Sequence, residues 1–81
     1  MITKDSIESA YCFFHQKLRI YEKSTLDWQR DDIEYAIADY TNRMSQELYA
    51  QLSDGRPDYL RDHQHFEADL RHAVEKLESP A

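Results

Sequence analysis

The chain of 81 residues contains one glycine, two prolines and one cysteine. Strands joined by tight turns need turn-forming residues at regular intervals and a hydrophobic period of two, and neither pattern is present. Gly55 and Pro57 lie together and indicate one loop, whereas Pro80 lies close to the last residue. The scarcity of turn residues therefore predicts an all-α protein.

Cysteine is limited to Cys12, so a disulfide within the chain is excluded. Secreted domains of this size usually carry several cysteines. The segment from Met1 to Asp5 also lacks the basic region and apolar run of a signal peptide or a membrane anchor. We expect a cytoplasmic protein with no membrane attachment.

Positive charge is scarce, with ten lysines and arginines against sixteen acidic residues and a formal net charge of −6. The cations are scattered from Lys4 to Lys76, and no basic patch with interleaved aromatic residues can be drawn. Because an acidic chain repels a phosphate backbone, direct nucleic-acid binding is not expected. A single glycine also excludes a glycine-rich phosphate loop.

Hydrophobic periodicity predicts four helices within one domain that spans residues 1–81. The predicted helices cover about 4–22, 26–43, 46–52 and 58–78, and residues 79–81 form a frayed tail. The short connections favour a compact antiparallel bundle of three long helices and one short helix. The predicted N-terminal caps are an Asp5–Glu8 capping box or Thr3, then Ser24 or Thr25, then Ser45. The last helix is expected to start with Pro57 in its first turn, and the alternative is a later start capped by Asp62.

One apolar side of each helix is predicted to face the core. Gly55 is expected to supply a left-handed turn after the third helix, and Tyr59 to lie on the apolar side of the last helix, one turn before the other core residues of that helix. The predicted core residues are, in chain order, Ile7, Tyr11, Phe14, Leu18, Tyr21, Leu26, Ile33, Ile37, Tyr40, Met44, Leu48, Leu52, Phe66, Leu70, Ala73, Val74 and Leu77.

A second apolar row is present on each of the first two helices. Phe13 and Ile20 are seven residues apart and nearly opposite the core side, and Trp28 and Tyr35 repeat this arrangement on the second helix. A helix that rests on a small core needs only one apolar side. Each second row is therefore either covered by another helix of the chain or available to a protein partner.

Carboxylates flank the Trp28–Tyr35 row. Asp31 lies on one side of it, and Asp32 and Asp39 lie on the other. Such a rim favours a partner with a basic surface and accelerates its encounter, whereas the plainer interpretation is a solvated helix face. Under the partner interpretation, the predicted binding residues are Phe13, Ile20, Trp28, Asp31, Asp32, Tyr35 and Asp39.

A histidine-rich stretch falls in the predicted last helix. Asp62, His65, Asp69 and His72 are spaced by three, four and three residues, which would stack them along one edge of a helix. Imidazole and carboxylate groups are zinc ligands, but one straight helix seldom converges four ligands on one ion. The alternative is that His65 and His72 pair with Asp69 at the surface while His63 packs against the edge of the core.

Catalytic chemistry finds little support in the sequence. Cys12 and His15 lie three residues apart on the first helix, but Cys12 lies among aromatic residues and is expected to be buried and inert. No cofactor is expected, and the chain is predicted not to be an enzyme. The leading hypothesis is a protein–protein interaction module that could form a homodimer. The alternatives are an acidic modulator of a basic protein and a metal-binding helical bundle.

Overall fold

The computed structural model describes residues 2–78. It contains four helices, which are α1 (Lys4–Lys23), α2 (Asp27–Arg43), α3 (Gln46–Ser53) and α4 (Phe66–Glu78). The all-α architecture of three long helices and one short helix is confirmed, with no strand among the described residues. The predicted tail at 79–81 lies outside the described residues.

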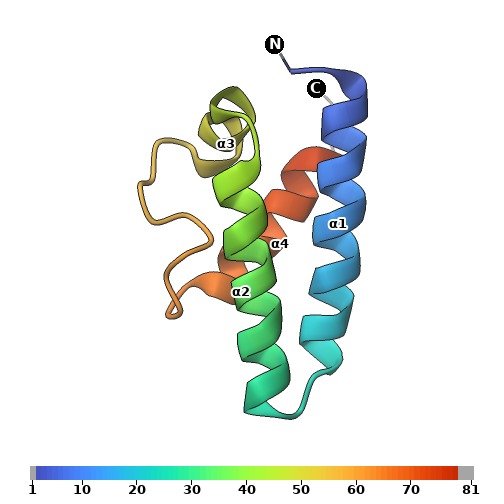
Figure 1. The fold of residues 1–81 in the computed structure, drawn as a ribbon, viewed down its shortest axis with the longest axis vertical. Coiled ribbons are helices and arrows are strands. Elements are labelled where there is room, and N and C mark those ends of the chain that lie inside the picture. Colours follow the sequence, from blue (N-terminus) through green and yellow to red (C-terminus); the bar gives the residue numbers. More distant parts are fainter. Residues whose placement is uncertain (1, 79–81) are drawn as a thin grey trace.

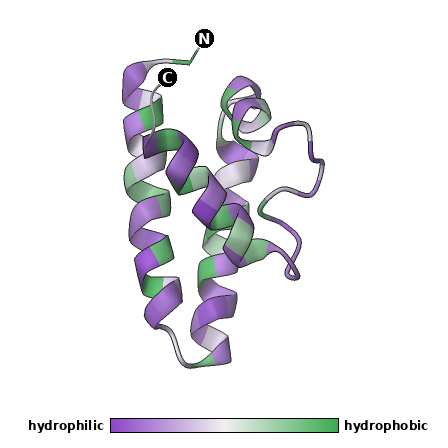
Figure 2. Ribbon diagram, turned by 180° about the vertical axis from the view of Figure 1, so that it is seen from behind, coloured by the Kyte–Doolittle hydropathy of each residue, from purple (hydrophilic) through white to green (hydrophobic). Residues whose placement is uncertain are grey.

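The first two helices form an antiparallel hairpin, and α4 lies across one side of it. In Figure 1, α1 descends, α2 rises beside it and α3 follows at the upper end of α2. Figure 2 shows the opposite side, where α4 crosses obliquely over the hairpin toward the start of α1. The Tyr11 hydroxyl donates a hydrogen bond of 3.1 Å to Glu78 Oε1, which joins α1 to the end of α4.

Two of the four helix starts have the predicted caps. Thr3 rather than Asp5 caps α1, because its Oγ1 accepts the Ser6 N–H at 3.1 Å. Ser45 caps α3 through the Leu48 N–H. The prediction of Ser24 or Thr25 as the cap of α2 is wrong, since Leu26 occupies that position without a side-chain hydrogen bond. Ser24 instead closes α1 by donating to the Ile20 carbonyl oxygen at 2.7 Å.

The core lies between the hairpin, α3 and α4. Its fully buried large side chains come from every helix and from the segment before α4, and they are Phe14, Ile37, Leu52, Tyr59, Leu60, Phe66 and Leu70. Most of the predicted core residues are buried or packed against this cluster. Leu26 is the exception: it is 47% exposed, because it lies in the turn before α2 and outside the helical periodicity.

The predicted start of the last helix near residue 58 is wrong, because α4 begins at Phe66. Residues 54–65 form a chain of turns instead, and Leu60 has a φ of +61° in the left-handed region. Tyr59 and Leu60 are adjacent yet both buried, whereas a helix would separate their directions by about 100°. The left-handed turn brings both side chains to the core. A helix start predicted from Pro57 does not take such a turn into account.

The turn after α3 agrees with the prediction for Gly55. Asp54 ends α3 in the left-handed conformation, with a φ of +53°, and Gly55 follows with a φ of +86°. Glycine adopts this conformation without the steric cost that a β-carbon adds. The chain thereby leaves α3 and enters the 54–65 segment, which packs back against α4.

Candidate interaction surface

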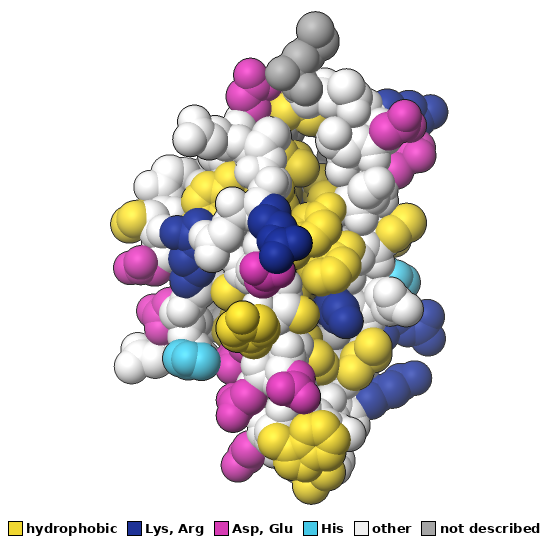
Figure 3. Space-filling model, viewed as in Figure 1, with side chains coloured by type: hydrophobic (Ala, Val, Ile, Leu, Met, Phe, Trp, Pro, Cys, Tyr) yellow, Lys and Arg dark blue, Asp and Glu magenta, His cyan; other side chains and the backbone are white. Residues whose placement is uncertain are grey.

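The hairpin face is the side of α1 and α2 that is turned away from α4. It carries the two second apolar rows, Phe13 with Ile20 and Trp28 with Tyr35. Figure 3 shows this side, where hydrophobic side chains follow α2 and the line between α1 and α2. Ile20, Trp28 and Tyr35 in these rows are exposed, whereas Phe13 is partly buried.

The α2 row is the most exposed part of this face. Trp28 is 61% exposed and Tyr35 is 76% exposed, whereas Ile33 and Ile37 on the opposite side of the same helix are buried. Trp28 does not fold back over the start of α2 to bury its ring. Both aromatic side chains are therefore accessible to another molecule.

The α1 row is only partly open. Phe13 stacks on Tyr40 of α2, with ring centroids 4.2 Å apart and an interplanar angle of 12°, and the Lys17 ammonium lies 5.5 Å from the Phe13 centroid. Ile20 is 46% exposed. The partial burial of Tyr40 is consistent with this stacking: burial raises the pKa of its hydroxyl. Phe13 thus joins the two helices, while Ile20 extends the apolar surface toward the turn.

Charges of opposite sign border the face on its two helices. Asp31 and Asp32 are exposed and form no ion pair with any other described residue, whereas Asp39 pairs with Arg43 at 3.4 Å. In Figure 3, acidic side chains gather over the lower part of α2 and basic ones over the lower part of α1. The basic group consists of Lys17, Arg19 and Lys23. These residues look scattered along the whole sequence, but they all lie in the second half of α1.

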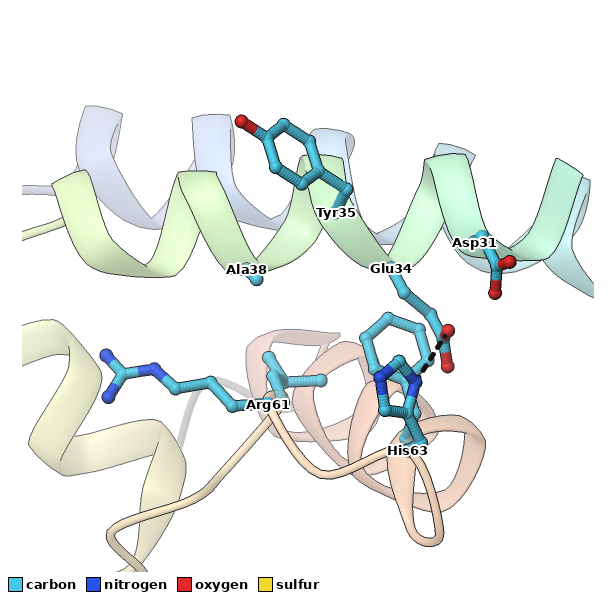
Figure 4. A pocket seen from close by; sticks show the side chains of 8 residues that line it. Asp31, Glu34, Tyr35, Ala38, Arg61 and His63 are labelled. Atoms are coloured by element: carbon cyan, nitrogen blue, oxygen red, sulfur yellow. Dashed lines mark hydrogen bonds and ion pairs between the residues drawn. The ribbon is translucent and has the colours of Figure 1, made fainter. Parts of the chain in front are cut away.

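A surface groove lies beside the α2 row, between α2 and the segment that leads into α4. It has a volume of about 480 Å³, and Ala38, Leu60 and Phe66 contribute its apolar wall. Figure 4 shows Glu34 and His63 pointing toward one another across the groove, while Tyr35 stands at the rim and points away. The Glu34–His63 contact, at 2.9 Å, therefore closes one end of the groove.

Glu34 is the nearly buried partner of the Glu34–His63 pair. Its side chain is 11% exposed, in contrast to 81% for His63. Burial raises the pKa of Tyr21, and the neighbouring Glu34 carboxylate raises it further while Arg30 opposes the effect. His63 consequently lies at the surface against α2, and the predicted packing of its ring on the edge of the core is wrong.

The four metal-ligand candidates are not gathered into a metal site. Asp62 and His65 lie in turns before α4, where the Asp62 carboxylate accepts the Gln64 N–H at 2.9 Å. The buried Asp69 carboxylate is bound by Arg56 at 2.9 Å and by the Leu60 N–H at 3.3 Å. Within residues 2–78, no group of three or more histidine, cysteine or acidic residues has an arrangement that would hold a metal ion.

His72 belongs to a different network from the predicted one. Its Nδ1 lies 3.0 Å from the Tyr59 hydroxyl, which also donates to the Asp69 carbonyl oxygen at 2.9 Å, and its Nε2 lies 3.3 Å from Asp54. Burial raises the pKa of Tyr59, and the Asp69 carboxylate adds to this effect. The hydrogen bond from Lys76 lowers the pKa of Asp54. The expected surface pairing of His65 and His72 with Asp69 is therefore wrong, and this network holds the 54–65 segment on α4.

Cys12 is exposed, which contradicts its expected burial. It lies on the outer side of α1, because the core side is occupied by Ala10, Phe14 and Leu18. His15, three residues later, stacks on Tyr11 with centroids 5.3 Å apart. The aromatic neighbours of Cys12 in the sequence point in other directions around the helix, so adjacency along the chain did not imply burial.

Comparisons with known proteins found no match for this chain. No protein-family model matches the chain, and neither a curated protein nor a solved structure matches it significantly. None of the helices described between residues 2 and 78 combines the length and the apolar character needed to cross a bilayer. Functional inference consequently rests on the geometry and chemistry of the hairpin face.

Proposed function

We propose that this chain is a non-enzymatic protein-interaction module that binds a protein partner through the hairpin face. The observation that carries the proposal is the exposure of Trp28 (61%) and Tyr35 (76%), seven residues apart on one side of α2. Tryptophan and tyrosine are enriched among residues that dominate binding energy at protein interfaces. Ile20 and Leu26 add exposed apolar surface close to the turn between α1 and α2.

The polar and charged groups on the two sides of the hairpin differ in whether they have partners within the fold, and this difference supports the choice of surface. On the α4 side, the buried Asp69 carboxylate and the Tyr59 hydroxyl have hydrogen-bonding partners within the fold. On the hairpin face, large apolar side chains remain exposed, and Lys23, Asp31 and Asp32 have no ion-pair partner among the described residues. Exposed apolar surface with a polar rim is typical of a binding site. The proposal retains the cytoplasmic location expected from the lone cysteine.

A second candidate function is an acidic modulator that presents carboxylates to a basic protein. It is favoured by Asp27, Asp31 and Asp32, which are exposed in the first turns of α2 and form no ion pair within residues 2–78. Binding of this kind should weaken strongly with added salt, because exposed charges are screened over about 8–10 Å at ordinary ionic strength. An interface dominated by Trp28 and Tyr35 should depend much less on salt.

The test compares Trp28→Ala with Glu75→Ala, an exposed residue on α4. Because Trp28 is largely solvated in the free protein, we expect Trp28→Ala to change the free energy of unfolding by no more than about 0.5 kcal/mol. Partners should be cross-linked to the wild type in the cells that produce it, then purified and titrated against all three proteins. We expect Trp28→Ala to weaken the measured affinity at least roughly tenfold and Glu75→Ala to leave it unchanged.

Two results would contradict the proposal. If Trp28→Ala lost several kcal/mol of stability, the ring would belong to the core rather than to a binding surface. If wild type and Trp28→Ala bound every purified partner equally, the hairpin face would not be the docking site. Trp28 is the only tryptophan in the chain, so its fluorescence reports directly whether a partner covers it.

A further inference from the structure

The hairpin face carries opposite charges on its two halves. The last two turns of α1 contain Lys17, Arg19 and Lys23, and none of these forms an ion pair with another described residue. The first turns of α2 contain three carboxylates with the same property, Asp27, Asp31 and Asp32. These groups lie at the same end of the hairpin, one on each helix, as Figure 3 shows.

The register of the hairpin is given by Phe13, which stacks on Tyr40. Two antiparallel helices rise equally per residue, about 1.5 Å, so ten residues further along α1 correspond to ten residues back along α2. Lys23 is therefore level with Arg30 and adjacent in height to Asp31. By the same count Tyr35 is level with Leu18, within one turn of Ile20.

Consider a two-fold axis that lies in the hairpin face and runs parallel to the helices. This axis places a second copy of the chain against the hairpin face. Rotation about it places α1 of one copy on α2 of the other at the same height and with opposite chain direction. The basic turns of each α1 then meet the acidic turns of the other α2, and Tyr35 meets Ile20 of the second copy. Every contact occurs twice, as a symmetric interface requires.

We propose that the partner on the hairpin face is a second copy of this chain, arranged with α1 of each copy on α2 of the other. This inference rests on the proposed function and specifies its partner. Tyr35 and Ile20 form the centre of the interface, and Lys23 pairs with Asp31 of the second copy at its edge, near the turn between α1 and α2. The resulting dimer brings four antiparallel helices together along one axis.

Charge balance favours a second copy over a basic partner. A uniformly basic protein would be attracted by Asp27, Asp31 and Asp32 but repelled by Lys17 and Lys23 on the adjacent helix, since like charges across an interface are unfavourable. A second copy offers basic residues to the acidic half of the face and acidic residues to the basic half.

The test uses two charge reversals, Lys23→Glu and Asp31→Lys, with Glu75→Lys on α4 as the matched control. Mass is measured by sedimentation equilibrium over a concentration series at low and high salt, and Trp28 fluorescence is recorded on the same samples. We expect the wild type to form a dimer in which Trp28 emission shifts to shorter wavelength. Each reversal places like charges together at two symmetric contacts, so each should weaken dimerisation at least roughly tenfold.

Mixing the two single variants gives the decisive result. A mixed dimer of Lys23→Glu with Asp31→Lys has opposite charges at both edge contacts, so it should form with near wild-type affinity although neither variant dimerises well alone. The double variant should dimerise for the same reason. Glu75→Lys should behave as the wild type, and circular dichroism should show unchanged helix content in every variant.

Three outcomes would overturn the inference. A wild type that stays monomeric up to about 1 mM would exclude a second copy as the partner. A dimer that is insensitive to both reversals would lie on another surface, and one that the mixture does not restore would have a different symmetry. None of these results removes the broader interaction module, which fails if Trp28→Ala loses several kcal/mol of stability or has no effect on binding to any purified partner.

Discussion

Both sides of the α1–α2 hairpin carry aromatic residues, but these residues are buried on one side and largely exposed on the other. On the α4 side, Phe14, Tyr59 and Phe66 are at most 2% exposed. On the hairpin face, Trp28 and Tyr35 are mostly exposed, and Phe13 is partly buried where it stacks on Tyr40. Residue type therefore does not decide burial in this protein. The position of α4 does, because it covers one side of the hairpin and leaves the other to solvent or to a partner.

Charged residues follow the same division. Arg56, Asp69 and Lys76 on the α4 side have ion-pair partners that connect the 54–65 segment, α3 and α4. Lys23 and Asp31 on the hairpin face have no ion-pair partner within residues 2–78. One side of the hairpin thus has its charges paired within the fold, whereas the other presents charges that have no ion-pair partner within residues 2–78. Substitutions on the two sides should therefore affect different measurements.

The largest expected difference comes from two adjacent phenylalanines that point to the two sides. Phe14→Ala removes a fully buried ring, so we expect it to lower the free energy of unfolding by about 3–5 kcal/mol. Phe13→Ala removes a partly buried ring that stacks on Tyr40, and we expect a smaller loss of about 1–2 kcal/mol. Urea unfolding followed by circular dichroism measures both values. Equal losses would show that the hairpin face is as tightly packed as the core and would abolish the contrast.

The next effect concerns Arg56, whose guanidinium contacts the buried Asp69 carboxylate at 2.9 Å. Arg56→Ala leaves that carboxylate without its cation and removes the contact of the guanidinium with the Tyr59 ring, so we expect a loss of about 1–3 kcal/mol. Arg71→Ala is the control, because Arg71 pairs with Glu22 and Glu67 at half-exposed positions. Its removal should cost no more than about 1 kcal/mol. If the two losses were the same in urea titrations, the 54–65 segment would not depend on this ion pair.

The smallest of these effects is the loss of one buried hydroxyl in Tyr59→Phe. At neutral pH the variant loses the hydrogen bond to the Asp69 carbonyl oxygen, which contributes about 1 kcal/mol. Burial raises the pKa of Tyr59 above its ordinary value of 10.0, so the folded state keeps the proton that the unfolded state releases. The stability gained from this difference is present below pH 10 and is lost as the pH rises further.

Stability measured from neutral pH to about pH 11 checks this linkage. The wild type should lose stability more steeply than Tyr59→Phe above about pH 10, so the difference between them should narrow. Tyr11, Tyr21 and Tyr40 also have raised pKa values, which leaves a decline common to both proteins. Parallel pH profiles would indicate that Tyr59 ionises as readily in the folded state as in the unfolded one.

Local sequence signals determined the first three helices, the part of α4 from Phe66 onward, and which side of each helix is apolar. The seven-residue spacing of Trp28 and Tyr35 placed them opposite Ile33 and Ile37, and the structure confirms that the second pair is buried while the first is exposed. Helical periodicity is a property of the backbone, so it can be read from spacing alone. The caps by Thr3 and Ser45 were readable for the same reason, since each involves residues only three positions apart.

Only the tertiary structure decided what lies across from each side. Residues 54–65 adopt turns rather than helix because Arg56, Tyr59 and Leu60 each find partners on α4, about ten residues or more away in the chain. Those contacts removed Asp69 and His72 from the predicted metal-ligand edge. The exposure of Cys12 and of the hairpin face likewise follows from where α4 packs. Such long-range contacts are chosen by shape and charge in three dimensions, which the spacing of residues along one helix does not specify.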